Sequence, residues 1–135
     1  MDRVFLDANI LYSAAYLEGS GLARLWTLKG TTLLSSGYAI EEARRNLAID
    51  RVEAISRFKK LAGNVSLIDA PPGLSLPASV RLDSKDRPIL LSAIHGKADY
   101  LLTGDAHHFG HLYGMRIEGV LVFRPAQYFE QRGRS

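Results

Sequence analysis

Short apolar runs alternate with helical patterns along the whole chain, and this alternation constrains the fold more than any other feature. We expect strands at residues 4–6, 31–35, 65–68, 100–102 and 120–123. Helical patterns fall at residues 9–17, 22–28, 38–49, 50–61, 86–94 and 125–131. Strands that are separated by helices usually pair in parallel, because a parallel pair needs a crossover connection. The sequence therefore predicts an α/β fold with a mainly parallel central sheet of about five strands, flanked by helices.

Length and composition indicate one globular domain spanning residues 1–135. No repeat, low-complexity block or long linker divides the 135 residues, and 47% of them are hydrophobic, which is ordinary globular usage. No apolar run approaches the roughly 20 residues that cross a bilayer, and the first residues do not resemble a signal peptide. We therefore expect a cytoplasmic protein without membrane association. Because the chain has no cysteine, disulfides, thiolate zinc sites and cysteine nucleophiles are excluded.

Acidic side chains stand where ligands of a parallel sheet bind. Asp7 follows the first predicted strand, Asp105 follows the fourth, and Asp86 begins a predicted helix. Either Glu41 or Glu42 lies in the first turns of the helix after the second strand. Open α/β sheets bind ligands beyond the carboxyl ends of their strands. Four carboxylates can therefore gather at one edge of the sheet.

Such a cluster needs a cation, because carboxylates held close together repel one another and raise each other's pKa. Ligand sets made only of oxygen select hard cations, so we expect Mg²⁺ or Mn²⁺. A bound cation can lower the pKa of a coordinated water and neutralise charge on a phosphoryl group. The chain has 17 Lys+Arg against 14 Asp+Glu. With four acids assigned to the cation, 17 basic residues face 10 acidic ones, which suits a polyanionic substrate.

Each of these acids also has a simpler structural interpretation. Asp7 and Asp86 could only cap the helices that follow them, and Asp105 could be only a turn residue. Glu41 has Arg45 four residues later, a favourable surface pair, and this favours Glu42 as the site residue. Two other aspartates are set aside: Asp69 follows a strand expected at the sheet edge, and Asp99 lies at the entering end of its strand. The His107–His108 pair is also set aside as a zinc site, because the chain has no cysteine to complete the ligands.

The segments around the acids resemble the four acidic motifs of the PIN-domain family, in the family's order. They are residues 4–11 (VFLDANIL), 36–43 (SGYAIEEA), 84–90 (SKDRPIL) and 98–105 (ADYLLTGD). The resemblance implies one PIN-like nuclease domain that uses divalent metal to cleave RNA, often as a homodimer. Many small bacterial members are VapC-type toxins that an antitoxin protein neutralises. The resemblance also selects Glu42 and gives Asn9 and Thr103 supporting hydrogen-bond roles.

Two basic residues flank one of the proposed metal ligands. Lys85 and Arg87 enclose Asp86, and we expect them to contact the RNA backbone. The cations of residues 50–61 are expected to form a solvated helix face.

Two other functions remain possible from the sequence. A haloacid-dehalogenase-type phosphatase would need acids where this chain has Asn9 and Phe109. A catalytically silent RNA- or partner-binding module would have little reason to keep clustered like charge.

Overall fold

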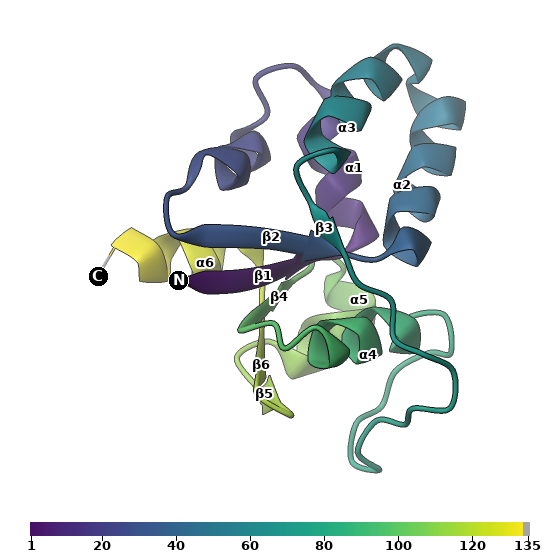
Figure 1. Ribbon diagram of the computed structural model, residues 1–135, viewed down its shortest axis with the longest axis vertical. Coiled ribbons are helices and arrows are strands. Elements are labelled where there is room, and N and C mark those ends of the chain that lie inside the picture. Colours follow the sequence, from purple (N-terminus) through teal and green to yellow (C-terminus); the bar gives the residue numbers. More distant parts are fainter. Residues whose placement is uncertain (134–135) are drawn as a thin grey trace.

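A six-stranded sheet forms the centre of the molecule in a computed structural model that describes residues 1–133 (Figure 1). The strands are β1 (Asp2–Leu6), β2 (Thr31–Ser35), β3 (Ser66–Leu67), β4 (Tyr100–Leu102), β5 (Arg116–Ile117) and β6 (Val120–Phe123). Their order across the sheet is β3-β2-β1-β4-β6-β5, and all neighbours are parallel except β5 and β6. The predicted α/β class and mainly parallel sheet are therefore confirmed.

The strand that the sequence analysis did not anticipate is β5. It forms a hairpin with β6 in which Ile117 pairs with Val120. The two residues between them, Glu118 and Gly119, both have positive φ angles, of 49° and 88°. Two-residue hairpin turns of this kind need left-handed backbone at both positions. Glycine adopts it freely but glutamate does not, and this concealed the turn in the sequence.

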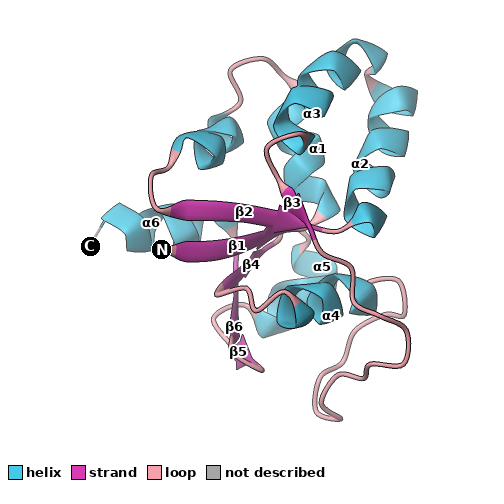
Figure 2. Cartoon of the chain, in the orientation of Figure 1, coloured by secondary structure: helices cyan, strands magenta, loops and turns pink. Residues whose placement is uncertain are grey.

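The helices pack on both sides of the twisted sheet (Figure 2). In Figure 1, α1 (Ala8–Tyr16), α2 (Gly37–Asp50) and α3 (Ile55–Ala62) form one group above the sheet. Below it lie α4 (Arg87–His95) and α5 (Ala106–Phe109), and α6 (Pro125–Gly133) lies near the N-terminus. Residues Gly21–Thr27, Val52–Ala54 and Gly110–Leu112 form short 3₁₀ segments. None of the described helices is long and apolar enough to cross a membrane.

Two expected helices differ from the observed ones. The stretch expected at 22–28 is a 3₁₀ helix. The helix expected at 50–61 begins later, because α2 continues through Asp50 and the chain turns at Arg51. Asp50 does not cap the next helix, since its carboxylate accepts a hydrogen bond of 2.7 Å from the Tyr12 hydroxyl. That bond joins the end of α2 to α1.

The central strands β1 and β4 fix the position of the site. Val4, Phe5 and Leu6 of β1 and Leu101 and Leu102 of β4 are fully buried, which is expected for strands covered on both faces. Leu6 pairs with Leu102 in the register of the two strands. The next residues, Asp7 and Thr103, therefore leave the sheet side by side at its carboxyl edge.

Candidate metal centre

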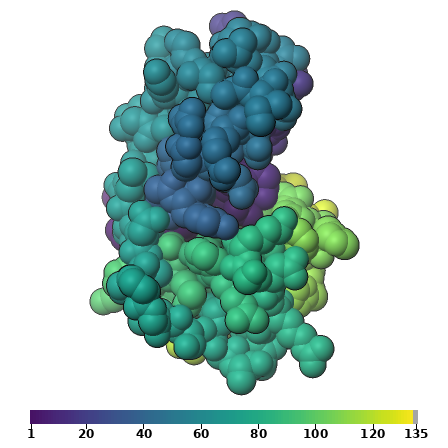
Figure 3. All heavy atoms as spheres, turned by 90° about the vertical axis from the view of Figure 1, so that its right-hand side faces the viewer, coloured from purple at the N-terminus to yellow at the C-terminus, as the bar shows by residue number. Residues whose placement is uncertain are grey.

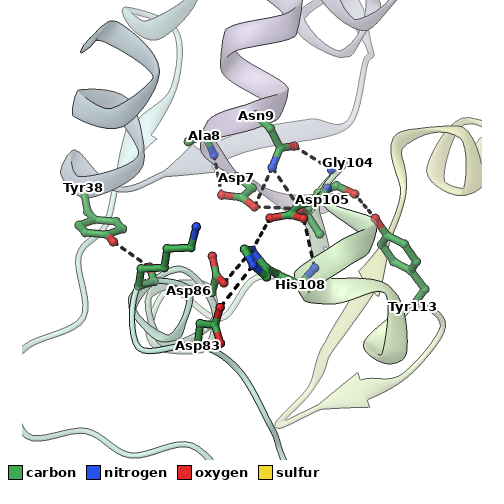
Figure 4. A network of polar contacts seen from close by, with 12 residues as sticks. Asp7, Ala8, Asn9, Tyr38, Asp83, Asp86, Gly104, Asp105, His108 and Tyr113 are labelled. Atoms are coloured by element: carbon green, nitrogen blue, oxygen red, sulfur yellow. Dashed lines mark hydrogen bonds and ion pairs between the residues drawn. The ribbon is translucent and has the colours of Figure 1, made fainter. Parts of the chain in front are cut away.

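Asp7 is a buried carboxylate at the end of β1, with 5% of its surface exposed. Its Oδ1 accepts a hydrogen bond of 2.7 Å from the Ala8 backbone N–H, and it thereby caps α1. Its Oδ2 accepts from the Thr103 hydroxyl at 2.8 Å and from the Asn9 amide at 3.0 Å (Figure 4). The capping interpretation of Asp7 is therefore correct, but it accounts for one of the two carboxylate oxygens.

Burial raises the pKa of Asp7 to about 6, from an ordinary value of 3.8. The hydrogen bonds from Thr103 and Ala8 favour the charged form and oppose this rise, while the nearby charges of Glu42 and Asp86 add to it. The folded chain therefore keeps a carboxylate where its negative charge is unfavourable. A cation would relieve this unfavourable charge.

A polar bracket formed by Asn9, Thr103 and Tyr113 holds the ends of β1 and β4 together. The Asn9 amide oxygen accepts from the Gly104 backbone N–H at 2.7 Å. The fully buried Thr103 donates to Asp7 and accepts from the Asp105 backbone N–H at 3.1 Å. The Tyr113 hydroxyl donates to the Thr103 carbonyl at 2.8 Å. Asn9 and Thr103 therefore both donate hydrogen bonds to the Asp7 carboxylate.

Asp86 stands before α4 but does not cap it, because its side chain makes no capping hydrogen bond. It is 9% exposed, and its buried Oδ2 has no hydrogen-bond partner among the described residues. Burial raises its pKa, and the charges of Asp105 and Asp83 add to this, whereas His108 and Lys85 lower it. A buried oxygen without a hydrogen-bond donor is rare in folded proteins, and this one lies 3.3 Å from Nδ1 of the His108 ring.

Asp105 has a clear structural role as the N-cap of α5. Its Oδ1 accepts from the His108 backbone N–H at 3.1 Å, and its Oδ2 lies 2.8 Å from Nδ1 of the His108 ring. The charge of Asp105 reaches Asp86 and raises the pKa of that carboxyl. Asp105 therefore faces the same cluster while it also orients the histidine.

The structure places Glu42 beside Asp7 and Glu41 on the surface. Glu42 is half-buried on α2, lines a small cavity of about 150 Å³ with Asn9, and acts electrostatically on Asp7. Glu41 is exposed and forms a salt bridge with Arg44. The expected surface partner was Arg45, so the pairing is one residue off, although the reason for preferring Glu42 is unchanged.

Asp83 and His108 also belong to this cluster, although Asp83 was not singled out from the sequence and His108 was set aside there as a zinc ligand. The His108 ring lies between three carboxylates: Nε2 is 3.3 Å from Asp83 Oδ2, and Nδ1 is 3.3 Å from Asp86 Oδ2 and 2.8 Å from Asp105 Oδ2. Asp83, Asp86 and His108 each offer a ligand atom within 4.8 Å of the other two, and they are the one such group within residues 1–133. The spacing of Asp105 and His108, three residues apart on one helical turn, was the available sequence signal.

The basic residues near the site are of two kinds: some are exposed and one binds backbone carbonyls. Lys85 and Arg87 are exposed on either side of Asp86, and Arg87 lines a pocket of about 510 Å³ that includes Asp83 and His108. Arg57 was expected to be solvated, but its guanidinium donates to the Ala15 and Tyr16 carbonyls at 2.9 and 3.1 Å. It therefore satisfies the end of α1.

The site opens on the side of the molecule where the two helix groups meet. In Figure 3 the blue residues of α2 lie above the green residues of α4 and α5, with purple N-terminal residues between them. Figure 4 shows the corresponding side chains, with His108 among Asp83, Asp86 and Asp105, and Asp7 above them.

An α/β domain with a buried Asp7 and a half-buried Asp105 beyond the carboxyl ends of two central parallel strands is the arrangement of the PIN class. Residues 3–107 match the family described as the PIN domain, and the chain belongs to that family. This membership argues against the phosphatase alternative. A chain from the crystal structure of VapBC2 from Rickettsia felis, bound to a DNA fragment from their promoter, has the same fold. The TM-score is 0.60 at 13% identity, over 90% of this chain and 98% of that one. No curated protein matches the sequence.

Proposed function

We propose that this chain is a divalent-metal-dependent endoribonuclease. The observation that carries the proposal is the buried Asp7, whose pKa of about 6 reflects burial beside Glu42 and Asp86. Near neutral pH this carboxyl is mostly charged in a place that disfavours charge. Structures keep such groups chiefly at functional sites. Membership of the PIN-domain family makes RNA the substrate that we propose.

The residues that would hold Mg²⁺ or Mn²⁺ are Asp7, Glu42, Asp86 and Asp105. Their donor atoms are all oxygens, which suits hard cations, and the partnerless Oδ2 of Asp86 fits the position of a ligand. When bound, a divalent cation there supplies an activated water and stabilises charge on the phosphodiester. No side chain of this chain needs to act as the nucleophile.

The remaining polar residues orient the ligands and bind RNA. Thr103 and Asn9 fix Oδ2 of Asp7 by two donated hydrogen bonds, so the carboxylate cannot rotate freely. Lys85 and Arg87 are exposed beside Asp86 and in our proposal contact the phosphate backbone. Phosphate contacts of this kind position a strand without reading its sequence.

We further propose that the chain is the toxin of a toxin–antitoxin pair and acts in the cytoplasm. Support comes from the shared fold with a chain of VapBC2, a structure of a complex bound to DNA from the partners' own promoter. In this proposal the partners are RNA, an antitoxin protein and a second copy of the chain. The neighbouring reading frame tests the toxin role directly, because a small adjacent antitoxin gene is expected there.

Cleavage of a labelled single-stranded RNA by the purified chain tests the nuclease proposal. We expect cleavage with Mg²⁺ or Mn²⁺, none in excess EDTA, and none by Asp7→Asn. Asp69→Asn is the matched control, because Asp69 also follows a strand but its carboxylate caps α2 through the Gly37 backbone N–H at 3.0 Å. Full cleavage in EDTA, or by Asp7→Asn, contradicts the proposal. Binding of RNA without any cleavage would favour a silent RNA-binding module.

A further inference from the structure

Tyr38 is an exposed aromatic residue next to the acids of the site. It lies in the first turn of α2, and 42% of its surface is exposed. Its hydroxyl donates a hydrogen bond of 2.7 Å to the Lys85 carbonyl, in the segment that leads into α4. The side chain therefore joins the two helix groups at the open side of the site, and its position is fixed although much of its surface meets solvent.

Three of the acids lie close to this ring. Glu42 is four residues after Tyr38, on the same face of α2, and Asp86 directly follows Lys85. Burial raises the pKa of the Tyr38 hydroxyl, and the charges of Glu42 and Asp86 raise it further. The charge of Asp7 acts in the same direction, and Figure 4 shows Tyr38 to one side of Asp7 and Asp86. An uncharged ring thus stands at the edge of the proposed metal centre.

Tyr113, on the other side of the acids in Figure 4, is used within the fold. It is half-buried, and its hydroxyl donates inward to the Thr103 carbonyl at 2.8 Å. The Arg124 guanidinium lies 5.7 Å from the centre of its ring. No ring or guanidinium among residues 1–133 is stacked on Tyr38 in this way. Of these two tyrosines, Tyr38 is therefore the one that can accept a flat ligand.

An exposed aromatic ring beside basic residues suits an unpaired nucleic-acid base. Proteins that bind single strands stack bases on aromatic side chains and contact the backbone with cations. Lys85 and Arg87 are exposed in the segment to which the Tyr38 hydroxyl is bound. A base inside a duplex is already stacked on its neighbours and cannot reach such a ring. The chemistry at Tyr38 therefore fits RNA that is unpaired at this point.

We propose that Tyr38 is a stacking platform for an unpaired base of the RNA, beside the phosphate that is cleaved. The inference rests on the proposed function and adds that the substrate is single-stranded at the cleaved position. A tyrosine face does not read the edges of a base, so it contributes affinity with little sequence preference. Tyr38 would hold the strand and take no part in the bond-breaking step.

Binding of a fluorescein-labelled oligoadenylate, measured by anisotropy with Ca²⁺ in place of Mg²⁺, tests the platform. Tyr38→Leu removes the aromatic face and should weaken binding about 5- to 100-fold. Tyr38→Phe keeps the face and loses only the hydrogen bond to Lys85, so it should bind almost as tightly as the unaltered chain. Tyr16→Leu is the matched control, because Tyr16 is at the far end of α1 from Asp7 and Arg51 covers its ring at 4.2 Å.

An oligomer of the same length that carries no bases separates stacking from a structural role. At low salt all four proteins should bind it weakly and equally, because it offers nothing to stack on Tyr38. A loss in Tyr38→Phe as large as in Tyr38→Leu overturns the inference, since Tyr38 would then only tie α2 to the segment before α4. Equal losses in Tyr38→Leu with and without bases, or unchanged binding of oligoadenylate by Tyr38→Leu, overturn it as well.

Cleavage with Mg²⁺ is a separate measurement on the same proteins. A chain that binds oligoadenylate through Tyr38 and cleaves no RNA retains the platform and loses the proposed nuclease function. A chain that cleaves RNA but binds it with no dependence on Tyr38 retains the nuclease function and loses the platform.

Discussion

Replacing Asp7 by asparagine should stabilise the metal-free protein at neutral pH. The carboxyl has a pKa of about 6 in the folded chain against an ordinary value of 3.8. Each pKa unit corresponds to about 1.4 kcal/mol. Ionising Asp7 therefore costs the folded state about 3 kcal/mol more than it costs the unfolded chain. Because Asp7 is 5% exposed, solvent screens little of this cost.

The direction in which the contribution of Asp7 to stability changes with pH follows from proton uptake. Between about pH 3.8 and pH 6 the folded state binds more protons than the unfolded state, so the contribution of Asp7 to stability falls as pH rises through this window. Above the window the penalty is complete. The asparagine of the variant cannot ionise, but its amide nitrogen would meet the Asn9 amide as donor against donor. The Thr103 hydroxyl can turn to accept from that nitrogen, so about one hydrogen bond is lost, at a cost of about 1 kcal/mol.

The expected net result is a variant about 2 kcal/mol more stable than the original chain at about pH 7.5, and slightly less stable below about pH 4. Urea unfolding in EDTA, followed by the fluorescence of the single tryptophan, Trp26, measures the free energy of unfolding of both proteins at each pH. The pH at which the two proteins are equally stable follows from the same series. Glu41→Gln is the control with the opposite sign, because the Arg44 side chain lowers the pKa of Glu41.

Added Mn²⁺ should reverse the order of stability. A ligand at one hundred times its Kd stabilises the protein that binds it by about 2.7 kcal/mol, and the variant lacks a ligand. A variant that is less stable than the original chain at every pH, or a difference that does not change with pH, refutes the reasoning about Asp7.

Three further outcomes can be measured on the same protein. Glu42→Gln should remove most RNA cleavage and Glu41→Gln little, since only Glu42 lies beside Asp7; the reverse order would mean that the second motif is assigned one residue off. Thr103→Val should lower both RNA cleavage and the urea midpoint, because Asp7 loses a hydrogen-bond donor, at a cost of about 1–3 kcal/mol in the free energy of unfolding. An unchanged midpoint would mean that the hydrogen bond from Thr103 does not stabilise the fold. RNA binding can be measured with Ca²⁺ across a salt series, as log affinity against log salt. Arg87→Ala should reduce the slope by about 0.7, the value for one lost phosphate contact on a single strand, and Lys59→Ala should leave it unchanged. Equal slopes for all proteins would mean that the RNA does not contact Arg87.

The positions of three acids could be predicted because they depend on short-range patterns. Asp7 directly follows an apolar run and Asp105 comes three residues after the end of another, and parallel pairing brings both strand ends to one edge. Helical spacing placed both Glu41 and Glu42 off the apolar face of α2, and Glu42 was preferred because Glu41 had a surface partner and because the PIN-domain resemblance selects Glu42. The two aspartates needed only the period of strands and helices and the rule that strand ends share an edge.

The position of His108 could not be predicted in the same way. Its contacts with Asp83 and Asp86 join parts of the chain more than twenty residues apart, through a segment without regular structure between β3 and α4. Such a segment carries no periodic pattern from which its path can be read. The same limitation applies to Arg57, whose role as a cap of α1 depends on how α3 packs.

The hydrogen bond between Asp7 and Thr103 determines how early during protein synthesis the site can form. The two residues are 96 positions apart, and a chain grows from its N-terminus, so Asp7 leaves the ribosome long before Thr103 does. Until β4 has been made, Asp7 has neither its buried surroundings nor the threonine that orients it. A ribosome-bound fragment therefore carries the first acid without a pocket, and any nuclease activity must wait until most of the sheet has been synthesised.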